Sequence, residues 1–239
     1  MPSAAGQPQS LTDEAYQLLR RQVLDCELLP GQWLSERQVS ADIGIGLSPV
    51  RGALARLDHE GLVIIAPRRG YKVAPLTIKG VEELFQAWRI IGPAIARQAA
   101  LNMTPADMKR YRAIIGRRPG KLSTAREMAR RLGLADERFE LLCQVAGNSI
   151  MTEIYRKLAG DQRRVFSFVH VTDPGSLSFL DEPADVEEAY ASNDGETAAR
   201  AVTDFIDRAR AAIIGALQLS ATVLSTELVP PADRIRRIG

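Results

Sequence analysis

The first 77 residues carry an apolar pattern that predicts three short helices. From Thr12 to Leu24 apolar side chains recur at helical spacing, with Thr12 as the cap and two acidic residues in the first turn, where the helix dipole favours anions. A second helix begins at Ser35, which forms a capping box with Gln38, and ends at Gly44. Both helices present one apolar side, so we expect them to pack on a shared core.

The third helix follows a short turn and has the pattern of a recognition helix. Ser48 is its expected N-cap, and Pro49 stands at the first helical position, where its missing N–H costs nothing. Arg51 falls on the side away from the apolar stripe, which consists of Val50, Ala53, Leu54 and Leu57. A β-rich run at 62–66, a turn at 67–70 and a short strand at 71–74 then predict a hairpin. Three helices followed by a hairpin predict a winged helix-turn-helix.

After a linker at 75–79 the pattern is almost entirely helical. Helix starts are predicted at Thr104-Pro105 and at the capping box of Thr124 and Glu127. Helix stops are predicted at 147–148 and 193–195, and 172–185 has the composition of a loop. The fold class is therefore mainly α, with an N-terminal winged helix-turn-helix and an all-helical C-terminal bundle. The expected organisation is a disordered lead-in at 1–11, a DNA-binding domain at 12–76, a helical domain for effector binding and dimerisation at 80–225, and a tail at 226–239.

Composition narrows the class of protein. The 239 residues are 46% hydrophobic and 25% charged, a usual balance for a globular protein that buries a core. Two cysteines, Cys26 and Cys143, cannot build a disulfide framework or a cysteine-rich zinc site, so we expect a reducing, cytoplasmic setting. The chain shows no apolar run long enough to span a membrane and no signal-peptide layout.

Charge is spread unevenly along the chain. Residues 1–77 carry eight basic and eight acidic side chains, so any DNA binding there depends on a few placed arginines. Residues 101–131 carry nine basic and two acidic side chains. We interpret this second stretch as a solvated helix face, with a place near DNA as the alternative.

The order of these motifs resembles one known family. Over residues 12–75 the chain resembles the winged-helix domain of the GntR family of bacterial regulators, through the segments Leu34-Ser35-Glu36-Arg37, Ser48-Pro49-Val50-Arg51, Glu60-Gly61-Leu62-Val63 and Arg68-Arg69-Gly70. The resemblance implies DNA contacts by Arg37, Ser48, Arg51 and Gly70. Independently, an exposed arginine at the start of a recognition helix can hold guanine by two hydrogen bonds. The predicted DNA-binding set is Arg37, Ser48, Pro49, Arg51, Arg68, Arg69 and Gly70.

One position departs from that family. Where its members usually carry an arginine just before the residue that caps the recognition helix, this chain has Leu47. One base or phosphate contact is therefore expected to be missing, and the operator is expected to differ from the common family type.

The second half resembles the FCD domain, the helical effector module of the FadR-like GntR subgroup, over residues 80–220. The resemblance rests on Trp88-Arg89-Ile90-Ile91, Asp136 with Phe139, Ala146-Gly147-Asn148, Arg163-Arg164, and Asp194 with Ala198. Many such domains hold a divalent metal through one aspartate and three histidines. Asp136 matches the aspartate, but Glu140, Pro183 and Phe205 stand where the histidines are expected. We therefore predict no standard metal site; an altered one built from Asp136, Glu140 and His170 is the alternative, beside a packing role for His170.

Without a metal, arginine is the expected anchor for an effector, because its planar fork pairs with both oxygens of a carboxylate. Arg89 and Arg163 are candidates, with Asp136 and Glu140 as their alternative salt-bridge partners. Arg89 could instead pair with an acid elsewhere. The predicted effector-binding set is Arg89, Asp136, Glu140, Asn148 and Arg163.

Together these features predict a DNA-binding transcriptional regulator, a repressor by analogy, controlled by a small carboxylate-bearing metabolite. A homodimer on a near-palindromic operator is expected, because protein symmetry is copied into DNA. Two other hypotheses stay open: an enzyme with a helical substrate domain, and a winged helix used only for protein contacts. The sequence has no glycine-rich phosphate loop and no nucleophile elbow, and Cys143 has no identifiable base, so no catalytic residue is predicted.

Overall fold

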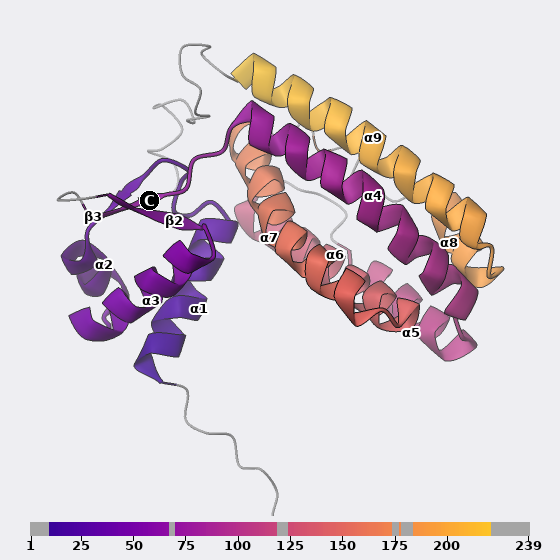
Figure 1. Cartoon of the computed structure of the whole chain (residues 1–239), viewed down its shortest axis with the longest axis horizontal. Helices are drawn as coiled ribbons and strands as arrows, with labels where there is room; N and C mark the ends of the chain where they lie inside the picture. The colour runs from indigo at the N-terminus through magenta and orange to yellow at the C-terminus, as the bar shows by residue number, and fades with distance from the viewer. Residues whose placement is uncertain (1–9, 67–69, 119–123, 174–176, 178–183, 221–239) are drawn as a thin grey trace, which may run out of the picture. The chain divides into compact units, whose positions relative to one another are not determined.

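The computed structural model describes residues 10–66, 70–118, 124–173, 177 and 184–220. The chain divides into two compact units, and the boundary falls between Leu76 and Thr77 (Figure 1). No helix within the described ranges is long and apolar enough to cross a membrane.

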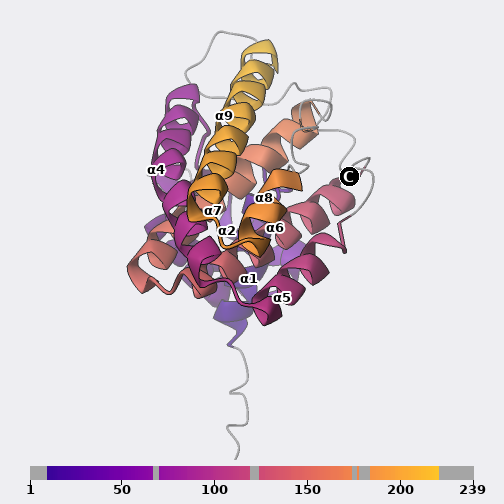
Figure 2. The ribbon, with the colours of Figure 1, turned by 90° about the vertical axis from the view of Figure 1, so that its right-hand side faces the viewer.

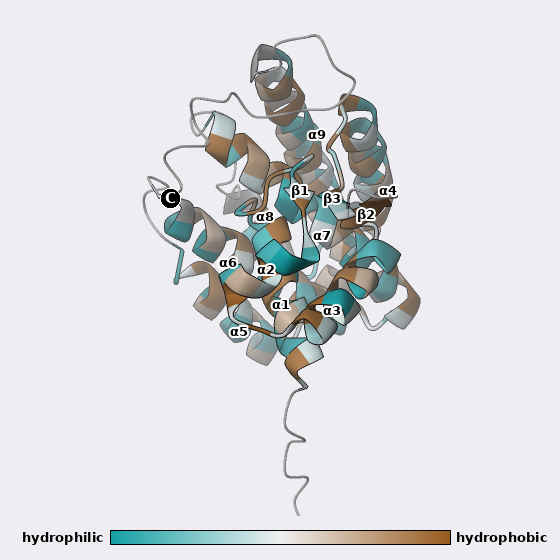
Figure 3. Cartoon of the chain, turned by 90° about the vertical axis from the view of Figure 1, so that its left-hand side faces the viewer, coloured by the Kyte–Doolittle hydropathy of each residue, from teal (hydrophilic) through white to brown (hydrophobic). Residues whose placement is uncertain are grey.

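The first unit contains three helices, α1 (Leu11–Leu24), α2 (Glu36–Ile43) and α3 (Leu47–His59). Their apolar stripes meet in one core, because each helix has a polar outer side and a buried inner side. The predicted stripe of α3 is confirmed: Val50, Ala53, Leu54 and Leu57 are fully buried. Ribbons coloured by hydropathy carry both hydrophobic and hydrophilic residues along each of these helices (Figure 3).

A three-stranded antiparallel sheet completes this unit, with strand order β1-β3-β2. Strands β2 (Val63–Ala66) and β3 (Gly70–Val73) form the predicted hairpin. Strand β1 (Trp33–Leu34) was not predicted, because two residues are too short for a strand pattern. It exists through pairing with β3, where Trp33 lies opposite Lys72.

Two predicted helix caps are each wrong by two positions. The cap of α1 is Ser10 rather than Thr12, and its hydroxyl accepts from the Asp13 amide at 3.1 Å. Ser10 and Leu11 thus belong to the helix region rather than to a lead-in. The cap of α3 is Gly46, with no side-chain bond, so Ser48 and Pro49 lie inside the first turn.

The capping box predicted at Ser35 is only half correct. Ser35 does cap α2, since its hydroxyl accepts from the Gln38 amide at 3.1 Å. The Gln38 side chain does not bond back to Ser35 but donates to Asp42 at 2.7 Å. Gly44 ends the helix in the left-handed conformation, as predicted.

The elements described in the second unit are all helices. Its longest helices, α4 (Ile78–Asn102) and α9 (Gly195–Ser220), run side by side (Figures 1 and 2). The others are α5 (Pro105–Ile115), α6 (Ala125–Ala146), α7 (Ser149–Thr172) and α8 (Ala184–Ala191). Trp88 of α4 is buried, with 2% of its surface exposed. Its ring centroid lies 5.7–6.3 Å from those of four phenylalanines: Phe85, Phe139, Phe166 and Phe205. The predicted mainly helical fold class is confirmed.

The start and stop signals of this unit are also confirmed. Thr104 and Thr124 each form a reciprocal capping box at the start of α5 and α6. Gly147 ends α6 in the left-handed conformation, and Asn193, with a φ of 56°, separates α8 from α9. The loop predicted at 172–185 lies largely outside the described residues, and so does the predicted tail.

Candidate functional sites

The first candidate site is the polar outer side of α2 and the start of α3. Arg37, in the first turn of α2, and Ser48 and Arg51, in the first two turns of α3, are all exposed. Pro49 between them is half-buried. These side chains leave the helices opposite to the buried stripe, which is the arrangement a recognition helix needs to reach base edges.

Arg51 is held in place by Glu36. Its Nε donates to both carboxylate oxygens at 3.1 Å, and its Nη2 donates to Oε2 at 2.9 Å. The Glu36 carboxylate raises the pKa of Arg51 above its ordinary value, so the guanidinium stays charged. The Arg51 side chain is 63% exposed, so solvent screens the ion pair: Glu36 orients the guanidinium but holds it only weakly.

Glu36 is a residue whose role the sequence did not indicate. It lies 15 positions before Arg51, on a different helix, so no helical periodicity connects the two. Only the packing of α2 against α3 brings them together.

Gly70 is essential for the backbone of the hairpin. Its φ is +91°, and a Cβ there would lie 2.7 Å from the backbone carbonyl oxygen of Leu34. It pairs with Ala66 at the start of β3. Arg68 and Arg69 lie outside the described residues. Leu47, where the family usually has arginine, is the first residue of α3 and is partly exposed.

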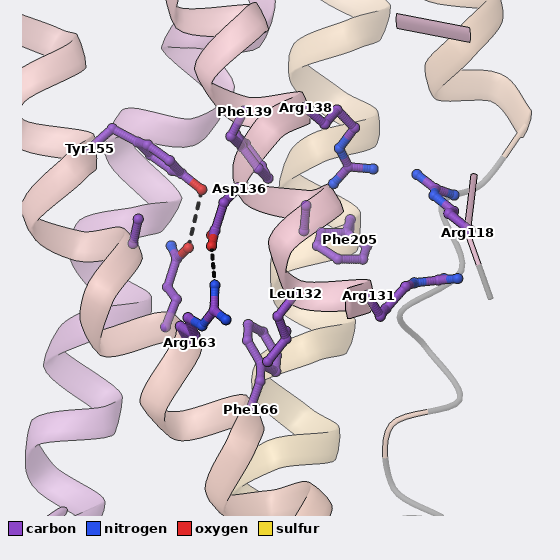
Figure 4. A pocket seen from close by; sticks show the side chains of 13 residues that line it. Arg118, Arg131, Leu132, Asp136, Arg138, Phe139, Tyr155, Arg163, Phe166 and Phe205 are labelled. Carbon is purple, nitrogen blue, oxygen red and sulfur yellow. Dashed lines mark hydrogen bonds and ion pairs between the residues drawn. The ribbon is translucent and has the colours of Figure 1, made fainter. Parts of the chain in front are cut away.

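The second candidate site is a cavity between α6 and α7. Its volume is about 50 Å³, and Phe205 of α9 closes one wall (Figure 4). It is lined by Arg118, Arg131, Leu132, Ala135, Asp136, Arg138, Phe139, Tyr155, Ala159, Gln162, Arg163, Phe166 and Phe205. Charged, amide and aromatic groups therefore face one enclosed space.

The described lining of this cavity is rich in arginine. Among the described residues that line it, four carry a guanidinium group and one, Asp136, carries a carboxylate. Arg163 donates through Nη1 to Asp136 Oδ2 at 2.8 Å. In Figure 4 the guanidinium groups of Arg118, Arg131 and Arg138 lie on one side of the cavity, and the Asp136–Arg163 pair lies on the other.

A buried polar pair stands beside that ion pair. The Tyr155 hydroxyl donates to Gln162 Oε1 at 3.2 Å, and burial raises the pKa of Tyr155 well above its ordinary value, so the hydroxyl stays protonated. Gln162 is 7% exposed, and within the described part of the chain its Nε2 has no hydrogen-bond partner. An unsatisfied buried amide N–H costs about 1–3 kcal/mol, so this group favours an added acceptor.

The structure brings together two of the five residues predicted for effector binding. Asp136 and Arg163 line the cavity. Arg89 lies outside the lining and donates to Asp207 at 2.9 and 3.2 Å. Glu140 also lies outside it and pairs with Arg156.

Asn148, the fifth of these residues, caps α7 by accepting from the Met151 amide. Five polar lining residues were not in the predicted set: Arg118, Arg131, Arg138, Tyr155 and Gln162. Arg131 belongs to the basic stretch at 101–131, and its burial contradicts a solvated position for that side chain.

The residues present do not fit a divalent metal. Asp136 and Glu140 each bind an arginine, and Arg156 lowers the pKa of Glu140. His170 is buried, its ring bonds the Thr124 backbone, and burial lowers its pKa. Among the described residues no group of three histidine, cysteine or acidic side chains could hold an ion, so Asp136, Glu140 and His170 do not form the altered site.

Cys143 lacks the character of a catalytic nucleophile. It is buried in α6, and burial raises the pKa of its thiol to about 11. A thiol with that pKa is almost entirely protonated near neutral pH, and the thiolate is the reactive form.

Two family models match the chain. Residues 11–73 match the model of the bacterial regulatory proteins of the gntR family, and residues 83–208 match the FCD domain. The second match alone covers more than half of the 239 residues.

Curated relatives and solved structures agree with these matches. The chain is 29% identical to the HTH-type transcriptional repressor RspR of Escherichia coli over 201 residues, which is 83% of this chain and 86% of RspR. Its fold is similar to E. coli McbR/YncC, with a TM-score of 0.71 and 19% identity over 85% of this chain and 97% of that one. A GntR regulator from Rhodococcus sp. RHA1 gives a TM-score of 0.67 and 20% identity, with the same coverage.

Proposed function

This chain belongs to the GntR family and is a DNA-binding transcriptional regulator with an FCD effector-binding domain, and we propose that it is a homodimeric repressor released from its operator by a small carboxylate-bearing molecule. The observation that carries the proposal is the exposed start of α3, where Glu36 orients Arg51 away from the core. An oriented arginine there can read guanine in the major groove.

The proposed DNA contacts follow from the positions of the side chains. Arg51 and Ser48 are assigned to base edges, and Arg37 and Pro49 to the adjoining backbone. Arg68 and Arg69 would reach the minor groove from the hairpin, with Gly70 giving the hairpin its shape. Phosphate contacts fix the position of the protein on the DNA, and base contacts determine which DNA sequence it recognises. The proposed contacts therefore include residues for both purposes.

The quaternary arrangement and the sign of regulation are part of the same proposal. A two-fold dimer places two winged helices on two half-sites, which gives a near-palindromic operator. Repression is supported by the likeness to RspR, whose name describes a repressor. The effector must bind the DNA-bound and free states with different affinity, because otherwise it shifts no equilibrium.

The effector is assigned to the cavity between α6 and α7. Asp136 and Arg163 are retained from the predicted set because both line it. A carboxylate suits this place, since guanidinium groups pair with it through two parallel hydrogen bonds.

A selection against random duplex DNA tests this function, with Arg51→Ala as the critical variant. We expect a near-palindromic site for the unmodified protein and a loss of about 1–3 kcal/mol of discrimination in the variant. Arg20→Ala is the matched control, because Arg20 also forms an exposed ion pair, with Glu60 of the same unit. A selected site that survives Arg51→Ala would favour a winged helix used for protein contacts.

Glu36→Gln tests whether the ion pair orients Arg51. The variant removes a negative charge near DNA, so affinity for random duplex should not fall. Discrimination between operator and random DNA should fall by up to about tenfold, because Arg51 loses its orienting partner. Competition binding at fixed salt measures both quantities. Glu27→Gln makes the same charge change at an exposed position and should keep discrimination; an equal effect of both variants would contradict the orienting role.

A further inference from the structure

We propose that the cavity between α6 and α7 binds a carboxylate ligand with two or more negative charges through guanidinium groups alone, without a divalent metal, and that Asp136 is the counter-ion which the ligand displaces from Arg163. This inference rests on the proposed effector control and names the chemistry of that same site. It assigns to Asp136 a role opposite to that of a metal ligand.

Arginine is the most frequent charged residue in the described lining. Four of the described lining residues are arginines and one is an aspartate, and guanidinium cannot be deprotonated in proteins, so the arginines keep their positive charge at every working pH. Arg131 and Arg138 are each 7% exposed, and buried charges interact more strongly than solvated ones. Such a lining repels a divalent cation and attracts an anion.

Asp136 already forms an ion pair with one of the arginines. Its carboxylate accepts from Arg163 at 2.8 Å, and the Arg163 side chain is only 18% exposed. A ligand carboxylate has the same charge and shape as the Asp136 side chain. The two therefore compete for one guanidinium.

The guanidinium donors lie on two sides of the cavity. Arg118, Arg131 and Arg138 lie on one side and Arg163 lies on the other, so a ligand with an acidic group at each end can pair with both sides at once (Figure 4). Gln162 offers an amide N–H without a partner in the described residues, and phenylalanine rings supply an apolar surface for the carbon skeleton: Phe139, Phe166 and Phe205.

The volume adds a requirement for movement. About 50 Å³ of free space has room for only a few water molecules, since one water needs at least about 10–15 Å³ of such volume. A ligand with several carboxylates is larger, so side chains must move when it enters. Opening the Asp136–Arg163 ion pair makes space and turns the Arg163 guanidinium toward the ligand. Because this pair joins α6 to α7, ligand binding would change the contact between the two helices.

The direction of the Asp136→Asn effect distinguishes this proposal from a metal site. A metal ligand is essential, so its loss would weaken or abolish binding. A competing counter-ion is inhibitory, so its loss frees Arg163 and strengthens binding. We expect at least about threefold tighter binding of a multivalent carboxylate, since removing a nearby carboxylate favours an added anion.

The experiment uses the full chain with EDTA present and ionic strength held constant. Acetate, malonate and propane-1,2,3-tricarboxylate serve as probes, measured by calorimetry and by the shift in melting temperature. Affinity should rise with the number of carboxylates, and added Zn²⁺ or Mn²⁺ should not be needed. Equal effects of acetate and tricarboxylate, or binding that requires the metal, would overturn the proposal.

Matched variants complete the test. Asp207→Asn removes an aspartate of the same exposure that also pairs with an arginine, and it should leave probe binding unchanged. Arg163→Gln and Arg131→Gln should each lower affinity about tenfold or more, as expected when a charged hydrogen-bond partner is lost. Arg163→Lys keeps the positive charge but lacks the planar guanidinium group, so partial probe binding in this variant would show that the cavity is still folded. Full affinity in Arg163→Gln would overturn the role of Arg163 as a ligand-binding residue.

The two proposals fail in different ways. Operator selection depends on the first unit, and probe binding depends on the second. A chain that selects an operator but ignores multivalent carboxylates retains the regulatory function and loses only the ligand assignment. A chain that binds the probes but selects no DNA retains the ligand assignment alone.

Discussion

At the scale of the single residue, Gly70 combines two constraints that no other described glycine of the first unit shares. Its φ of +91° lies in the region that side chains rarely adopt, and the Leu34 carbonyl oxygen occupies the space of a Cβ. Gly61 has a similar φ of +72°, but nothing lies within 4 Å of its Cβ position. Comparing substitutions at Gly70 and Gly61 therefore distinguishes the cost of backbone strain from the cost of a steric clash.

Replacing Gly70 by alanine should destabilise the first unit more than replacing Gly61. Gly61→Ala should cost about 1–2 kcal/mol of unfolding free energy from the left-handed backbone alone. Gly70→Ala should cost at least about 1 kcal/mol more, because β1 and β3 must move apart. Urea unfolding of both variants gives the comparison. Equal losses would mean that the hairpin relaxes without strain.

At the scale of the element, the helix starts in the second unit depend on local side-chain caps. Thr104 accepts from the Asp107 amide at 3.2 Å, and the Asp107 carboxylate accepts from the Thr104 amide at 3.4 Å. These bonds satisfy donors that the first turn of α5 leaves open. Because every partner lies within three residues, the sequence could predict this start.

Thr104→Ala should lower the free energy of unfolding by about 1 kcal/mol, since a capping side chain is lost. Hydrogen exchange at the Asp107 amide should accelerate. Thr203→Ala is the control: Thr203 lies inside α9 and bonds the Ala199 carbonyl, so its removal should be nearly neutral. Similar losses in both variants would argue against a capping effect.

At the scale of the whole molecule, the buried His170 links stability to pH. Burial lowers its pKa below the ordinary 6.5, despite the bond to Thr124 and the charge of Glu127, which act in the opposite direction. As pH falls through 6.5 the unfolded chain takes up a proton that the folded chain does not. Protonation therefore favours unfolding, so this stability is present above 6.5 and is lost below it.

His170→Gln should reduce that pH dependence. Between pH values of about 7.5 and 5.5, the variant should lose up to about 1 kcal/mol less unfolding free energy than the unmodified protein. Urea unfolding at several pH values measures the slope, which is independent of any constant cost of the substitution. His59→Gln, at an exposed position, is the control. An unchanged slope in His170→Gln would show that other groups carry the acid sensitivity.

The sequence alone determined what depends on neighbours along the chain. Apolar periodicity identified the buried stripe of α3, caps identified the starts of α5 and α6, and glycines identified the ends of α2 and α6. The same order of motifs identified the family. These features are local, because a helical side chain meets partners three or four residues away.

Tertiary structure decided what depends on partners far apart in sequence. The strand at Trp33–Leu34 exists only by pairing with β3, and Arg51 finds Glu36 across two helices. The cavity combines residues of α6, α7 and α9, so Arg131 lines it while Arg89, the more obvious candidate, pairs with Asp207. The sequence pattern around a charged side chain is the same whether that side chain faces water or a cavity. Only the packing of the helices determines which of the two it faces.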